Sequence, residues 1–202
     1  MKLYLFVAAA VAELIAVAAD LTPLQWVAKP LLAPLLIWYL ARRDLVVLAL
    51  CFATAGDIAL LVPGAFLIGM VFFLGCQVCL TVAFLRRAKP TKPTIIAYAV
   101  VWAAANALLW PHLGTLRLPV LAYSLALTAM ATAATAVSRR LAIGGALFVV
   151  SDLMIGMGAA GRHLPAHDVL VMATYSAALF LIATGWAATS RVPSPAPLPA
   201  AR

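Results

Sequence analysis

Two acidic side chains stand where chemistry inside a membrane would need them. The chain has only six acidic residues, yet Asp57 and Asp152 each interrupt an apolar run long enough to lie in lipid. A carboxylate at mid-bilayer costs roughly 3 kcal/mol on insertion scales, so such a residue is by default a functional site. Lys29 lies in another apolar run. One lysine does not neutralise two aspartates, so one carboxyl is expected to keep its proton and serve as a general acid.

The elements that position these residues are predicted to be membrane helices. Hydrophobic residues make up 66% of the chain and charged residues 10%, and the mean hydropathy is +1.10. Apolar residues run continuously instead of alternating, which excludes strands and predicts an all-α, polytopic membrane protein. We expect one domain over 1–190 and a disordered, Pro- and Ala-rich cytoplasmic tail over 191–202. Pro, Arg and Gly divide the domain into eight apolar stretches, at 3–19, 24–41, 45–62, 64–85, 94–110, 118–137, 141–158 and 169–188.

The first stretch could instead be a signal peptide. Lys2 precedes a short apolar segment, and Ala10-Val11-Ala12 has the form of a cleavage site. Apolar residues continue to Ala19, however. With only seven helices, the basic residues described next would no longer lie nearly all on one side of the membrane. We therefore favour eight helices.

Basic residues fall at alternate connections between the stretches. With eight helices nearly all of them share one side, and the positive-inside rule places both termini in the cytoplasm, in a bacterial inner membrane. The net charge of +8 is explained by this topology and by lipid headgroups, so no nucleic acid partner is needed. The basic residues that share this side are Lys2, Arg42, Arg43, Arg86, Arg87, Lys89, Lys92, Arg139, Arg140, Arg191 and Arg202.

Polar residues from seven helices share a predicted depth. At the helical rise of 1.5 Å per residue, all lie about 6 to 9 Å below the outer boundary. A layer of this kind indicates a site, although polar groups can also hold helices together. The residues are Glu13, Lys29, Asp57, Asn106, Tyr123, Asp152 and Tyr175.

Five short motifs in order resemble the YhhN-type lysoplasmalogenase family. They are Lys29-Pro30-Leu31, Gly56-Asp57, Gly69-x-x-Phe72-Phe73-Leu74, the run from Gly144 to Asp152 that ends in Ser-Asp, and Tyr175. The resemblance implies an eight-helix membrane enzyme that hydrolyses the vinyl ether bond of lysoplasmalogens to a fatty aldehyde and glycerophosphocholine or glycerophosphoethanolamine. It places Lys29, Asp57, Ser151, Asp152 and Tyr175 in the site, with Tyr123 as an addition. Gln77 stands where the family usually has a histidine.

Vinyl ether hydrolysis fits a pair of carboxyl groups. Slow protonation of the β-carbon creates an oxocarbenium ion, water adds to it, and the hemiacetal collapses to aldehyde and alcohol. Either Asp57 or Asp152 could donate the proton while the other activates water, much as paired acids do in glycosidases. Lys29 would contact phosphate or tune an acid. This chemistry needs no cofactor, and the partners are a lysophospholipid substrate and membrane lipid. Pro30 and Pro34 predict a kink and a lateral entrance at the helix over 24–41.

Three other classes of protein or site share some of these features, namely metal centres, transporters and intramembrane proteases. A metal centre is disfavoured because His112, His163 and His167 all fall in predicted loops, and Pro165 prevents one helix from presenting the last two on one face. A small-molecule or proton-coupled transporter would also use membrane acids and a lysine, but the halves show no evident repeat. An intramembrane aspartyl protease needs a glycine two residues before Gly56, which this chain lacks.

Overall fold

The described part of the protein is a bundle of eight α-helices. The computed structural model describes residues 1–41 and 44–189, and within these ranges it contains no strand. Two short 3₁₀ helices, η1 (Trp110–His112) and η2 (Gly114–Leu116), join α5 to α6. The all-α prediction is confirmed, and every predicted helix end lies within two residues of the observed one. The helices are α1 (Lys2–Ala18), α2 (Thr22–Leu40), α3 (Leu45–Leu61), α4 (Phe66–Leu85), α5 (Lys92–Leu109), α6 (Arg117–Val137), α7 (Arg139–Ala159) and α8 (His167–Thr189).

Five of the described helices are long and apolar enough to cross a membrane, namely α4 to α8, with the 3₁₀ turns extending α5 and α6. Helix α3 is apolar but has only 17 residues. Helix α2 continues through Pro30 and Pro34, which membrane helices tolerate because neighbouring groups can satisfy the freed carbonyls. The chain is an integral membrane protein. The tail over 191–202, and the basic residues Arg42, Arg43, Arg191 and Arg202, lie outside the described residues.

Local sequence explains where several helices begin. The Asp44 side chain caps α3 by accepting hydrogen bonds from the amides of Val46 and Val47, at 3.0 and 3.1 Å. Ser138 accepts one from the Leu141 amide at the start of α7. Proline occupies the first turn of α2 and of α5, where the missing N–H costs nothing.

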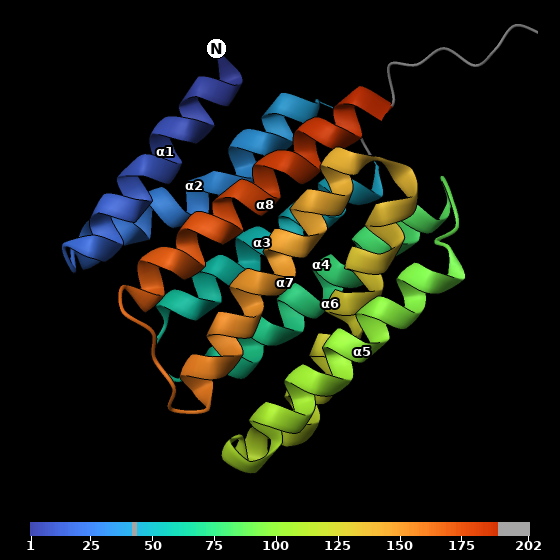
Figure 1. Ribbon diagram of the computed structural model, residues 1–202. Coiled ribbons are helices and arrows are strands. Elements are labelled where there is room, and N and C mark those ends of the chain that lie inside the picture. Colours follow the sequence, from blue (N-terminus) through green and yellow to red (C-terminus); the bar gives the residue numbers. More distant parts are fainter. Residues whose placement is uncertain (42–43, 190–202) are drawn as a thin grey trace, which may run out of the picture.

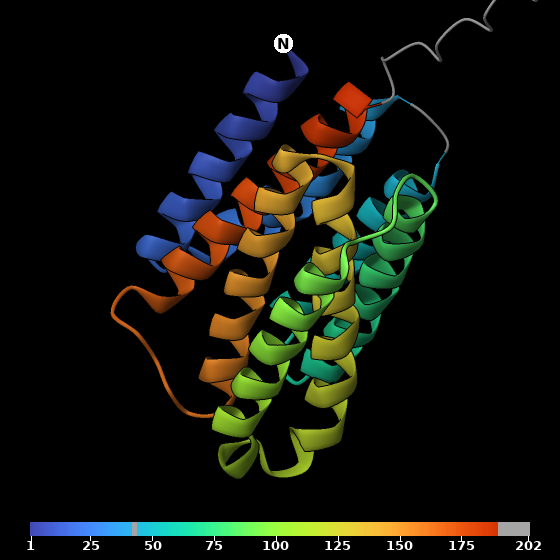
Figure 2. The same ribbon diagram turned by 45° about the vertical axis from the view of Figure 1, so that its right-hand side comes forward.

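Helices α6 and α8 hold the bundle together. Helix α6 packs against α4, α5 and α7, while α8 packs against α1, α2 and α7. Helices α1 and α5 lie at opposite sides of the bundle (Figure 1), and α5 comes to the front when the molecule is turned (Figure 2). Only Asn106 and Leu109 of α5 are buried, so α5 is the most peripheral wall.

Close helix contacts around α7 depend on glycine. A Cβ at Gly144 would lie 3.2 Å from the Ala178 carbonyl of α8, and one at Gly145 would lie 3.1 Å from Ala131 Cα of α6. These distances are tighter than nearly all real Cβ contacts. The missing side chains of Gly144 and Gly145 therefore let α8 and α6 pack closely against α7.

Basic side chains gather at one end of the bundle. Lys2 Nζ donates to the Trp38 carbonyl at 2.7 Å, and the Arg87 guanidinium donates to the Thr189 carbonyl at 3.2 Å and stacks over the Trp186 ring. The start of α1 and the end of α8 therefore lie at the same end (Figure 1). That this end faces the cytoplasm stays a prediction.

Candidate active site

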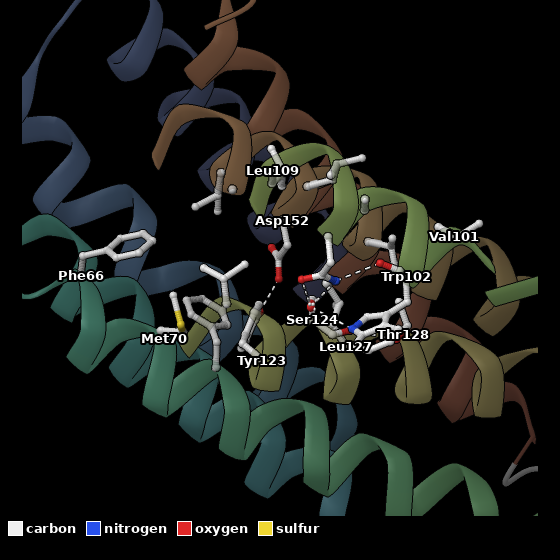
Figure 3. A pocket seen from close by; sticks show the side chains of 18 of the residues that line it. Phe66, Met70, Val101, Trp102, Leu109, Tyr123, Ser124, Leu127, Thr128 and Asp152 are labelled. Atoms are coloured by element: carbon white, nitrogen blue, oxygen red, sulfur yellow. Dashed lines mark hydrogen bonds between the residues drawn. The ribbon is translucent and has the colours of Figure 1, made fainter. Parts of the chain in front are cut away.

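A pocket lies between α4, α5, α6 and α7 (Figure 3). Its empty volume, with the mouth included, is about 830 Å³. Almost all of its wall is apolar, as in many small-molecule sites. Val101 of α5 is 46% exposed and lines the pocket, so the pocket reaches the outer surface of the bundle near the middle of α5.

Asp152 brings a carboxyl group into this pocket. It projects from α7, and Oδ2 accepts a hydrogen bond from the Tyr123 hydroxyl of α6. Figure 3 shows this pair, with Phe66 and Met70 on one side and Trp102 on the other. Because Tyr123 occupies Oδ2, the second carboxyl oxygen is the one available to a ligand or a proton.

Asp57 lies behind the pocket wall. Its side chain is only 1% exposed, and Oδ2 accepts a hydrogen bond from the Tyr175 hydroxyl of α8 at 2.7 Å. Asp57 and Asp152 are close enough to interact electrostatically. Each aspartate thus has its own tyrosine donor from a neighbouring helix.

The Phe73 ring lies between the pocket and the Asp57–Tyr175 pair. Phe73 lines the pocket, and its ring meets those of Tyr175 and Phe148 edge-on, with centroids 5.9 and 6.3 Å apart. The ring also packs on the bare Cα of Gly56, next to Asp57, since a Cβ there would lie 2.7 Å from it. Glycine before the first aspartate therefore makes room for this ring.

Lys29 of α2 and Glu13 of α1 lie near Asp57. Lys29 is partly buried and within electrostatic range of both Asp57 and Glu13. The Glu13 side chain is fully buried, and neither carboxyl oxygen has a hydrogen-bond partner among the described residues. Lys29 does not line the pocket, which favours a role as counter-charge over one as phosphate contact.

Asn106 belongs to a small polar cluster on the α5 and α6 walls. Its Nδ2 donates to the Trp102 carbonyl at 2.9 Å and to Ser124 Oγ at 3.0 Å. Trp102 Nε1 also donates to Ser124 Oγ, at 3.1 Å. Trp102 and Ser124 were not among the residues predicted from the sequence. The spacing of Trp102 and Asn106, one helical turn apart, was the available signal.

Ser151 and Gln77 are buried in the bundle but do not line the pocket. Ser151 Oγ donates to the Val171 carbonyl of α8 at 3.1 Å, which uses its only proton and ties α7 to α8. Gln77 lies near Tyr123, yet its amide oxygen and nitrogen have no hydrogen-bond partner in the described ranges. Ser176 Oγ is likewise buried without one there.

Of the predicted site residues, the pocket collects Asn106, Tyr123 and Asp152. The predicted entrance at α2 is not where the pocket lies, because no residue of α1, α2 or α8 lines it. Prolines indicated a distorted helix, but packing keeps α2 against α1 and α3. The open side instead includes α5, which buries little of its surface.

The histidines lie at the opposite end from most basic residues. His163 and His167 rings meet at 5.0 Å although α8 begins only at His167. His112 Nε2 lies 3.3 Å from the Arg162 guanidinium. Among the described residues, no three His, Cys, Asp or Glu side chains gather as a metal site would require.

Fold and pocket together define a helical membrane protein with an apolar cavity, a partly buried aspartate in the cavity wall and a fully buried aspartate behind it. The chain belongs to the YhhN family, whose profile matches residues 24–186. It is similar to the proteins named lysoplasmalogenase in Mycobacterium bovis and Mycobacterium tuberculosis, each 35% identical over 177 residues, which cover 78% of this chain and 66% of theirs. Lysoplasmalogenase TMEM86B of Sus scrofa is 32% identical over 136 residues, covering 66% of this chain and 59% of its own. The match thus spans just under two thirds of these relatives' length. No solved structure matches the chain.

Proposed function

We propose that the protein is a lysoplasmalogenase-like hydrolase that cleaves the vinyl ether bond of lysoplasmalogens by acid–base chemistry at Asp152 and Asp57. The observation that carries the proposal is one carboxyl, Asp152, exposed to an apolar pocket and oriented by Tyr123, with a second buried carboxyl near it. The names of the relatives support the substrate class. The apolar pocket suits a single-chain amphiphile, with its headgroup at the interface and its chain among the helices.

Contact with the pocket assigns Asp152 the first step. The acid form of Asp152 donates its proton to the β-carbon of the vinyl ether, and the electron pair of the double bond forms the new C–H bond. The resulting oxocarbenium ion is stabilised by the carboxylate left behind. Water then attacks the cationic carbon and gives a proton to a carboxylate. The hemiacetal hydroxyl next gives up its proton to form the aldehyde carbonyl, while the C–O bond to glycerol breaks and the glycerol oxygen takes a proton from a carboxylic acid. The products are a fatty aldehyde and the glycerophospho-alcohol.

Asp57 supports this cycle from behind Phe73. Its negative charge, held by Tyr175 and balanced by Lys29, acts on the oxocarbenium ion and on the protonation of Asp152 through space. Lys29 is therefore assigned a role toward Asp57, and Tyr123 one toward Asp152. Both tyrosines act as positioning residues for the carboxyl that each contacts.

The test measures aldehyde release by purified protein from lysoplasmenylcholine and lysoplasmenylethanolamine, beside a saturated-ether analogue. Release is expected from the vinyl ethers alone. Because a positioned general acid contributes about 10²- to 10⁴-fold, Asp152→Asn should lose at least about a hundredfold, and Asp57→Asn less.

Asp168→Asn is the matched control, since it makes the same chemical change at an exposed position, and it should keep full activity. Full activity in a folded Asp152→Asn variant would overturn the mechanism. No aldehyde from any substrate would overturn the function, and uptake of lipid into proteoliposomes without product would indicate a transporter instead.

A further inference from the structure

All hydrogen-bonding positions of the Ser124 hydroxyl in the pocket wall are used by neighbouring groups of the protein. Its oxygen accepts hydrogen bonds from Trp102 Nε1 and from Asn106 Nδ2. Its one proton has two possible acceptors, the Leu121 carbonyl at 3.1 Å and Asn106 Oδ1 at 3.4 Å. The shorter contact, within the same helix, is the better hydrogen bond. Ser124 thus acts as an anchor for its neighbours.

The hydrogen bond to the Trp102 carbonyl fixes the orientation of the Asn106 amide. The Trp102 carbonyl can only accept, so the group that meets it at 2.9 Å must be the NH₂. Both Nδ2 protons are then used, one on Trp102 and one on Ser124. Oδ1 is left with only the long contact to Ser124. Asn106 is 7% exposed and lines the pocket, so its oxygen is an acceptor in an apolar wall with no good donor of its own.

A buried acceptor of this kind calls for a donor from the ligand, since an unpaired polar group in an apolar environment is costly. Resting on the proposed function, we propose that Asn106 Oδ1 accepts a hydrogen bond from the free hydroxyl next to the ether, and so selects substrates in which that glycerol oxygen carries no acyl group. The hydroxyl is only a few bonds from the carbon that Asp152 protonates, so one molecule can engage both residues. An ester at that position has no proton to donate.

A neutral hydroxyl is the favoured donor over an ammonium headgroup. The lining of the pocket carries one acidic side chain, Asp152, which the chemistry uses, and is otherwise neutral and mostly apolar. Burying an ammonium against a single amide oxygen would leave its other protons unpaired. Choline headgroups have no N–H at all, and this difference separates the two possibilities in an experiment.

The experiment compares lysoplasmenylcholine with an analogue that has hydrogen in place of the hydroxyl, and with its O-methyl derivative. With the unmodified protein, loss of the hydroxyl should lower kcat/KM for aldehyde release roughly 10- to 100-fold, the range for an unsatisfied buried acceptor. Asn106→Leu should lower kcat/KM for the hydroxyl substrate to the level of the deoxy analogue, while the value for the deoxy analogue changes by less than about threefold. Ser124→Ala, which frees the amide, should give an intermediate loss confined to the hydroxyl substrate.

Equal rates on the hydroxyl and deoxy substrates in the unmodified protein would overturn this assignment and leave the proposed hydrolase standing. Persistent discrimination in Asn106→Leu would overturn it as well. A loss caused by Asn106→Leu that is seen with ethanolamine substrates but absent with choline substrates would assign the donor to the headgroup instead. No aldehyde from any vinyl ether would refute the proposed function itself. The comparison within the unmodified protein needs no variant to fold.

Discussion

Replacing Gly56 by alanine should disturb the boundary between the two aspartates. The new Cβ would lie 2.7 Å from two atoms of the Phe73 ring, whereas ordinary contact begins at 3.4 Å, so the ring must move by roughly 0.7 Å on the steep repulsive side of its contact. Overpacking of this kind costs about 1 to 3 kcal/mol, and the helix propensity of alanine returns about 1 kcal/mol. We expect a net destabilisation of up to about 2 kcal/mol.

The Phe73 ring contacts both the pocket and Tyr175, so its displacement should also lower the catalytic activity. A misplacement approaching 1 Å can cost on the order of a hundredfold in rate, and we expect a loss of tenfold or more in aldehyde release. Thermal unfolding in detergent and the release assay measure the two effects.

The control is a double-mutant cycle with Phe73→Leu, whose smaller side chain gives the new methyl group room. Gly56→Ala should cost much less stability in that background than alone. A Gly56→Ala protein as stable and active as the parent, or equal costs in both backgrounds, would refute the reasoning that Phe73 packs on a bare Cα.

Three further substitutions test polar groups that are buried or partly buried. Ser151→Ala should lose about 1 kcal/mol of stability, the usual value of one hydrogen bond, while keeping most aldehyde release; complete loss with a normal melting curve would indicate a nucleophile. Asp44→Ala removes the cap of α3 and the acceptor of Trp186 Nε1 at 2.8 Å. Tm should therefore fall by the equivalent of about 1 to 2 kcal/mol. Asp44→Asn keeps a side-chain oxygen and should lose less stability. Gln77→Leu removes an amide without a well-formed hydrogen bond and should raise Tm or leave it unchanged; a lower Tm would mean that the neighbouring Tyr123, water or lipid satisfies Gln77.

Helix positions were predictable because proline and clustered basic residues separate the apolar stretches of this chain clearly. Pro23, Pro93 and the basic clusters mark ends that packing then respects. Asp57 and Asp152 stood out from the sequence because the bilayer makes a carboxyl expensive. The tyrosine that serves each aspartate was not predictable, since it depends on the rotation of four helices about their axes.

The position of the pocket was not predictable either. Pro30 and Pro34 directed attention to α2, whereas the cavity depends on how little of α5 is buried, a property of packing and not of composition. Serine and tryptophan are ordinary residues of membrane helices, so Ser124 carried no signal, and Trp102 carried only its spacing from Asn106, until the fold brought the three together.

The weak attachment of α5 separates the residues that would carry the chemistry from the helix that shapes the cavity for the lipid. The aspartates and their tyrosines stand on α3, α6, α7 and α8, whereas the wall that the substrate meets opposite them is α5, with only two buried residues. Substitutions along α5 therefore alter the shape and polarity of the cavity at little cost to folding. A lineage can change its lipid preference by drift on this one helix while the chemistry stays under separate selection.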